Sequence, residues 1–191
     1  YALSRKSHPI TPYAPTGEFI YKNLIEKLMS KIEKFYSSTI PNTFVPGQIF
    51  LQDSTLSWPL EINNLDAIIT SPPFFDSTRF HSANWIRLWF SGWEPNDFKT
   101  IPTQYVDERQ KINFDVYDPI FEQAKQRLKS GGVMIFHLGK SVKCNMGEKL
   151  MQLSKKWFSH AELFDENVTH CAKFGIKDIG TVTSHQYLVL W

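Results

Sequence analysis

Four consecutive residues, Ser71-Pro72-Pro73-Phe74, combine groups that can hold the amino group of a planar heterocycle. The Ser71 hydroxyl and the Pro72 carbonyl can each accept a hydrogen bond. The prolines fix their own φ angles, so the carbonyl needs little reorganisation, and Phe74 offers a flat face for a ring. Accepting both N–H protons pushes electron density toward the nitrogen and makes its lone pair available for attack. The alternative interpretation is a proline-rich exit turn.

The elements before this motif must position it. The apolar, β-branched run 67–69 predicts a short buried strand. Because two prolines in a row cannot donate to a sheet ladder, that strand must end at the motif. In open α/β sheets, ligands bind at the carboxyl ends of the strands. Residues 47–52 predict another strand, which ends directly before Asp53-Ser54.

Ile68-Ile69-Thr70-Ser71-Pro72-Pro73-Phe74 resembles the catalytic (D/N/S)-P-P-(Y/F) motif of the DNA amino-methyltransferases, which methylate adenine N6 or cytosine N4. The stretch Leu128 to Leu138, with Leu-Lys-x-Gly-Gly before an apolar strand, is also similar to that family. The resemblance implies that Ser71, Pro72, Pro73 and Phe74 are catalytic. It implies that Asp53, with Ser54 and Thr70, binds the cofactor S-adenosylmethionine, Asp53 at its adenosine.

One part of the family pattern is missing from the sequence. The glycine-rich F-x-G-x-G cofactor loop does not occur, and neither does the acidic residue that would bind the ribose. Residues 1–8 resemble the helix that would follow the second strand, and no initiator Met precedes them. We therefore expect a missing N-terminal segment, or a second chain, to complete the cofactor site.

The resemblance also implies DNA as partner, with the target base flipped out of the duplex. Serine at the first motif position favours cytosine N4, and adenine N6 is the alternative. The loop 75–81 and the long irregular stretch 93–113 are expected to face the DNA. Four basic residues are candidate phosphate contacts, with solvated surface charges as the alternative: Arg79, Arg87, Arg109 and Lys111.

Two other functions remain open at the level of sequence. Related motifs act on amino groups of RNA, so an RNA amino-methyltransferase is one alternative. A non-catalytic nucleic-acid-binding subunit, or half of a split methyltransferase, is the other, because the cofactor loop is missing. The leading prediction is a DNA amino-methyltransferase of the restriction-modification type.

Histidines and cysteines give no metal-binding pattern. His137 follows a predicted strand, where it either lines the pocket or only ends the strand. Neither C-x-x-C nor H-x-x-x-H spacing occurs around Cys144, His170, Cys171 and His185, so we expect no metal site. Two distant cysteines favour a reducing compartment, and we expect a cytoplasmic protein of prokaryotic or phage-like type.

The remaining pattern predicts an α/β protein with a Rossmann-like methyltransferase fold, incomplete at the N-terminus. Its sheet is expected to be mostly parallel with a C-terminal antiparallel hairpin, and residues 1–191 to form a single partial catalytic domain. The predicted helices are 19–35, 83–90, 114–129 and 147–159, and the further strands 133–138, 161–168 and 186–191. Net charge +2 identifies no partner, 15% aromatic residues indicate a folded chain, and no apolar run approaches the about 18 residues of a membrane span.

Overall fold

The computed structural model describes residues 21, 23–75, 80–166 and 182–191. The chain divides into two compact units, Tyr1–Ile49 and Phe50–Trp191. Arg79 and the residues 167–181, which include His170 and Cys171, lie outside the described residues. The second unit contains the Ser71–Phe74 motif.

The first unit contains one described helix, α1 (Leu24–Tyr36), where the sequence predicts a helix over 19–35. Asn23 caps it, because its side-chain oxygen accepts hydrogen bonds from the backbone N–H groups of Ile25 and Glu26 at 3.0 and 3.4 Å. None of its side chains is buried. The amphipathic pattern therefore gives the helix but not a buried face.

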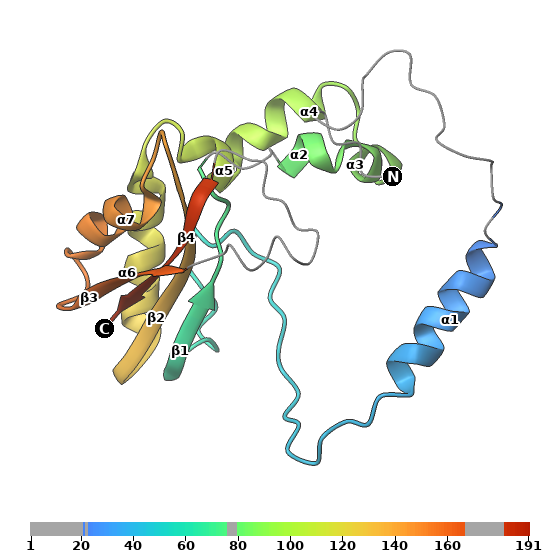
Figure 1. The fold of residues 1–191 in the computed structure, drawn as a ribbon, viewed down its shortest axis with the longest axis horizontal. Coiled ribbons are helices and arrows are strands. Elements are labelled where there is room, and N and C mark those ends of the chain that lie inside the picture. Colours follow the sequence, from blue (N-terminus) through green and yellow to red (C-terminus); the bar gives the residue numbers. More distant parts are fainter. Residues whose placement is uncertain (1–20, 22, 76–79, 167–181) are drawn as a thin grey trace. The chain divides into compact units, whose positions relative to one another are not determined.

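The second unit is built on a four-stranded sheet of order β1-β2-β4-β3 (Figure 1). The strands are β1 (Leu65–Thr70), β2 (Leu128–Ser141), β3 (Ala161–Glu166) and β4 (Val182–Leu190). The β1–β2 pairing is parallel, whereas β4 is antiparallel to both of its neighbours, β2 and β3. The α/β class and the C-terminal antiparallel pair are confirmed. The sheet is mixed, because β4 inserts between β2 and β3 and runs opposite to the other three strands.

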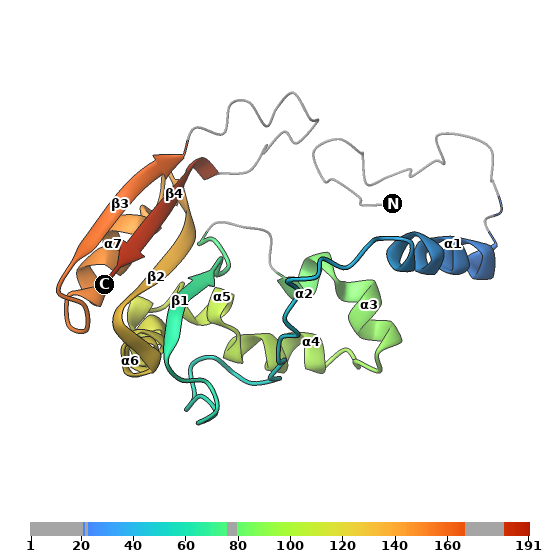
Figure 2. The ribbon, with the colours of Figure 1, turned by 90° about the horizontal axis from the view of Figure 1, so that it is seen from below.

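One face of this sheet carries the core. Helices α6 (Asp118–Arg127) and α7 (Met146–Ser154) lie against it (Figure 2). Alternate residues of the two central strands point into these helices and are 0–1% exposed: Met134, Phe136, Leu138, Leu188 and Leu190. The alternate residues of the same two strands, such as His137 and His185, point to the opposite face of the sheet. Period-2 alternation thus separates a packed face from a face that carries polar side chains.

The boundary between helix and central strand differs from the prediction. The segment 114–129 begins as a 3₁₀ turn (Phe114–Tyr117), continues as α6, and ends at Arg127. Strand β2 begins at once and takes up the predicted glycine-rich cap, in which Gly131 has a φ of 77°. The strand pairs Leu128 with Leu65 of β1, so tertiary pairing overrides the local helix signal.

The predicted strand over 47–52 is wrong. These residues form no strand, and the side chains of Ile49 and Leu51 are 97% and 104% exposed. A strand needs a neighbour for its backbone groups, and β1 ends the described sheet on this side. For the same reason β1 is not the buried strand that its composition predicts: Ile69 is 76% exposed.

Short helices fill the region between β1 and α6. The predicted helix over 83–90 is present as α2 (Phe80–Ala83) and α3 (Trp85–Phe90). The stretch 93–113 is more regular than predicted, because it contains α4 (Asp97–Thr100), a 3₁₀ turn (Ile101–Gln104) and α5 (Val106–Arg109). Among the described residues, no helix has both the length and the apolar character needed to cross a membrane.

Candidate functional site

The backbone of the Ser71–Phe74 motif leaves β1 and is held by the core. Gln110, which is 1% exposed, donates from Nε2 to the Pro73 carbonyl at 3.0 Å. Its Oε1 accepts a hydrogen bond from the Tyr117 hydroxyl at 2.8 Å. Burial raises the pKa of Tyr117, so its hydroxyl stays protonated and can donate. A buried polar chain therefore fixes the second proline of the motif.

Phe74 packs onto the polar face of the sheet. Its ring forms T-shaped contacts with His137 and His185, with centroid distances of 5.4 and 5.3 Å. The ring occupies the space beside Gly139, where an added Cβ would lie 2.6 Å from Phe74 Cδ2. Only glycine at this position of β2 leaves room for the ring.

We expect Gly139→Ala to lower the free energy of unfolding by about 1–3 kcal/mol, because the new methyl group must displace Phe74. Gly47→Ala is the matched control, since an added Cβ there meets nothing within 4 Å. Urea unfolding followed by tryptophan fluorescence measures the stability of the unit Phe50–Trp191, which holds all six tryptophans, and Gly47→Ala in the other unit should leave that signal unchanged. Equal stability of Gly139→Ala and Gly47→Ala would contradict the packing argument.

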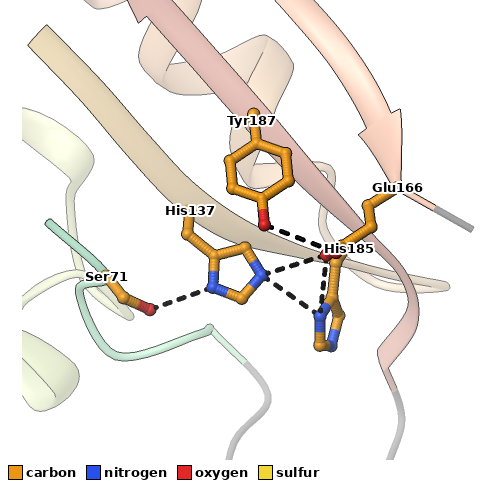
Figure 3. A network of polar contacts seen from close by, with 5 residues as sticks. All are labelled: Ser71, His137, Glu166, His185 and Tyr187. Atoms are coloured by element: carbon orange, nitrogen blue, oxygen red, sulfur yellow. Dashed lines mark hydrogen bonds and ion pairs between the residues drawn. The ribbon is translucent and has the colours of Figure 1, made fainter. Parts of the chain in front are cut away.

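A row of polar side chains crosses the sheet (Figure 3). Two of them, His137 and His185, contact Phe74. Ser71 Oγ lies 3.3 Å from His137 Nδ1, and His137 Nε2 lies 3.2 Å from His185 Nδ1. Glu166 Oε2 lies 3.5 Å from His137 Nε2 and 3.6 Å from His185 Nδ1. The Tyr187 hydroxyl donates to Glu166 Oε1 at 3.4 Å.

Sheet register explains how these residues meet. Gly139 of β2 pairs with His185 of β4, which in turn pairs with Glu166 of β3. Thr70, the last residue of β1, pairs with Phe136, so Ser71 comes beside His137. The row therefore lies at one end of the strands, where β1, β2 and β3 all end and β4 begins.

The contacts lead from the hydroxyl of Ser71 to the ring of His137 and then to the carboxylate of Glu166. This is the order of nucleophile, base and carboxylate in a catalytic triad. Nucleophilic acyl transfer also needs backbone N–H donors that stabilise an oxyanion, and one of them commonly follows the nucleophile. The two residues after Ser71 are prolines, which have no N–H. The arrangement therefore suits holding a donor group better than attacking a carbonyl.

A cavity of about 710 Å³ borders the motif at Pro73. Its lining joins Pro73 to Asp53 and to the short helices after Phe80. The complete lining is Leu51, Gln52, Asp53, Ser54, Pro73, Phe80, Gln104, Tyr105, Val106 and Asp107. Its volume falls in the range of small-molecule sites, and apolar side chains alternate with a few polar ones, as such sites require.

Asp53 begins a tight turn at this cavity rather than ending a strand. Its Oδ1 accepts hydrogen bonds from the backbone N–H and the hydroxyl of Thr55, both at 2.8 Å. These bonds, the backbone one foremost, hold the pKa of Asp53 below its ordinary value, with a smaller contribution from Arg109. Trp58 anchors the turn, because it donates from Nε1 to the Ser54 carbonyl and from its backbone to Gln123 of α6.

Because the folded-state pKa of Asp53 is depressed, its charge stabilises the fold above the unfolded value and loses this effect as pH falls through the folded value. Asp53→Asn should lower the free energy of unfolding at about pH 7 by less than about 1 kcal/mol, since the group is exposed. The difference should begin to shrink as pH falls to about 3.8, the ordinary pKa of the group, and should disappear as pH falls through the lower folded-state pKa. Urea unfolding of both proteins from about pH 7 to about pH 3 measures it. A difference that stays constant over this range would contradict the assignment.

The structure brings some of the predicted contact residues together and leaves others apart. Asp53, Ser54 and Pro73 line one cavity. Arg109 donates to the Thr55 hydroxyl at 3.2 Å and so lies beside the Asp53 turn. Lys111 pairs with Glu108 at 3.0 Å, whereas Thr70 remains in the ladder of β1 and Arg87 donates to Asn84 at 3.0 Å.

Sequence reasoning missed Glu166, Tyr187 and the buried Gln110, and it did not connect His137 with His185. Local motif spacing carries no signal for these residues, because Glu166 and Tyr187 lie on separate strands and Gln110 follows α5. The alternation of polar residues within β2 and β4 is the one available signal, and it gives the face but not the partner. The register of β4 between β2 and β3 supplies the rest.

Comparison of this chain with protein-family models gives no match, and comparison with curated proteins gives none either. The motif, its neighbours and their geometry are therefore the basis for assigning a function.

Proposed function

We propose that this protein methylates an exocyclic amino group of a base flipped out of DNA, with S-adenosylmethionine as methyl donor and cytosine N4 as the favoured target. One observation carries the proposal: the cavity of about 710 Å³ is bordered both by Pro73 of the acceptor motif and by Asp53, the residue expected at the adenosine. Methyl transfer requires donor and acceptor groups to meet at one place.

The residues of the cavity fit a nucleoside. The depressed pKa of Asp53 keeps a carboxylate charged at neutral pH, and a carboxylate accepts hydrogen bonds from N–H and O–H groups. Leu51, Phe80 and Val106 supply apolar walls for a purine ring. S-adenosylmethionine, when bound, supplies an electrophilic methyl group.

The motif would hold the acceptor. Ser71 Oγ and the Pro72 carbonyl can accept the two N–H protons of the amino group, which makes its lone pair more available. Gln110 and the proline rings restrain the carbonyl side. His137 Nδ1, 3.3 Å from Ser71 Oγ, fixes the direction of the hydroxyl.

The test uses the complete gene product and S-adenosylmethionine with a labelled methyl group. We expect label in duplex DNA, recovered as N4-methylcytosine after digestion, and none in an equal amount of transfer RNA. Label in RNA alone would favour the RNA amino-methyltransferase. No label in either, with S-adenosylmethionine bound only when a second chain is added, would favour a non-catalytic subunit or half of a split enzyme.

A further inference from the structure

Three side chains from three neighbouring strands converge on one point near the ends of these strands: His137 of β2, His185 of β4 and Glu166 of β3. Two imidazole nitrogens and one carboxylate oxygen form a donor set that suits divalent transition metals. The side chains are 23–32% exposed, so they are partly desolvated yet open to an ion from solvent.

The spacing of the three donor atoms matches a metal site. His137 Nε2, His185 Nδ1 and Glu166 Oε2 form a triangle with edges of 3.2, 3.5 and 3.6 Å. Around a tetrahedral ion with bonds of about 2.1 Å, two ligands lie about 3.4 Å apart. Around an octahedral ion with bonds of the same length they lie about 3.0 Å apart. The triangle therefore has the size of one face of a tetrahedron, with the fourth position left for water or another ligand.

His137 and Glu166 also have outer partners of the kind that metal ligands have. The second ring nitrogen of His137, Nδ1, contacts Ser71 Oγ at 3.3 Å. The second oxygen of Glu166, Oε1, accepts a hydrogen bond from the Tyr187 hydroxyl at 3.4 Å. Such contacts orient a ligand ring or carboxylate and leave the other donor atom for the metal.

The surroundings hold these side chains in place. The ring of Tyr187 stacks on His137 with a centroid distance of 5.1 Å, and Phe74 contacts both histidines. All three donors stand on strands that are hydrogen-bonded to one another, so the backbone positions are fixed by the sheet. A site on paired strands is pre-organised for an ion.

We propose that His137, Glu166 and His185 bind one divalent transition-metal ion of the zinc type, with tetrahedral geometry and one open position. The ion binds His137 through Nε2, so Nδ1 keeps its proton and donates it in a hydrogen bond to Ser71 Oγ. The same ion ties β3 to β2 across β4. Local spacing predicts no such site, because the three ligands stand on separate strands. The site does not depend on methyl transfer, because its ligands and its binding are defined without the cavity at Asp53.

The test titrates the full chain, first stripped with a chelator, with Zn²⁺ in a calorimeter and with Co²⁺ in a spectrophotometer. We expect one equivalent of each metal and the strong visible absorption of four-coordinate Co²⁺. Glu166→Gln and His185→Gln should each weaken Zn²⁺ binding by more than the about 10–100-fold that loss of an outer partner costs. His160→Gln is the matched control, since His160 stacks on Trp191 outside this cluster.

A second measurement does not depend on the folding of variants. Imidazole nitrogen NMR of the unmodified chain should show that Zn²⁺ shifts Nε2 of His137 and Nδ1 of His185, while His160 is unchanged. The proposal is overturned if no equivalent of Zn²⁺ binds, if these two nitrogens do not shift, or if both variants bind Zn²⁺ as tightly as the unmodified chain. A cluster held by hydrogen bonds alone would give the first of these results.

Discussion

Ser71→Ala is expected to lower the rate of methyl transfer to DNA by about 100- to 1000-fold, the usual effect of removing one pre-organised group at a reacting centre. The alanine keeps the backbone and both prolines but loses the oxygen that would accept an N–H of the target base. His137 Nδ1 then also loses its contact at 3.3 Å. Binding of S-adenosylmethionine should stay unchanged, because Ser71 does not line the cavity at Asp53.

The measurement is a single-turnover rate with labelled cofactor in the complete gene product. Ser159→Ala is the control, since Ser159 is exposed and its hydroxyl contacts His160 and Trp191. Ser71→Asp should restore part of the rate, because aspartate supplies an acceptor oxygen at the same position. A rate for Ser71→Ala equal to that of the control would remove Ser71 from the reaction.

Gln110→Leu is expected to lower the free energy of unfolding by about 1–3 kcal/mol. The leucine cannot donate to the Pro73 carbonyl, and it leaves the hydroxyl of Tyr117, a residue with 0% exposure, without its acceptor. Each buried polar group left without a partner costs about 1–3 kcal/mol. Because Pro73 belongs to the acceptor motif, the same change should also slow methyl transfer.

The double variant Gln110→Leu with Tyr117→Phe should be more stable than Gln110→Leu alone by about 1–2 kcal/mol, because no hydroxyl is then left buried. Urea unfolding followed by tryptophan fluorescence reports on the unit that contains Gln110 and Tyr117, since all six tryptophans lie within Phe50–Trp191. Simple addition of the two single effects would show that the two side chains are not coupled.

Local sequence patterns predict the elements that local chemistry controls. The prolines stop β1 where expected, α1 covers residues 24–35 of the helix predicted over 19–35, and the last two strands pair antiparallel. The patterns fail where a distant neighbour decides. Residues 47–52 have strand composition but no partner strand, and Leu128 leaves its predicted helix because it pairs with Leu65.

The residues of the candidate site likewise fall into those that the sequence predicts and those that depend on distant neighbours. Ser71–Phe74 and Asp53 stand out in the sequence by residue type, and the structure shows that Pro73 and Asp53 share a cavity. Gln110, Glu166 and the pairing of His137 with His185 could not be predicted, since each depends on the register between strands or on packing from another element. A shift of one residue in β4 would turn His185 to the other face.

The central position of β4 has a consequence for how the chain is made. Strand β3 has β4 as its neighbour in the sheet, and β4 also covers the second edge of β2. A ribosome must therefore synthesise the chain through Leu190 before β3 gains its partner and before Leu188 and Leu190 can enter the core. Until then α7 has an incomplete sheet to cover. The second unit completes its folding after synthesis of β4, and nascent chains that stop before Val182 would present exposed apolar surface to chaperones and proteases.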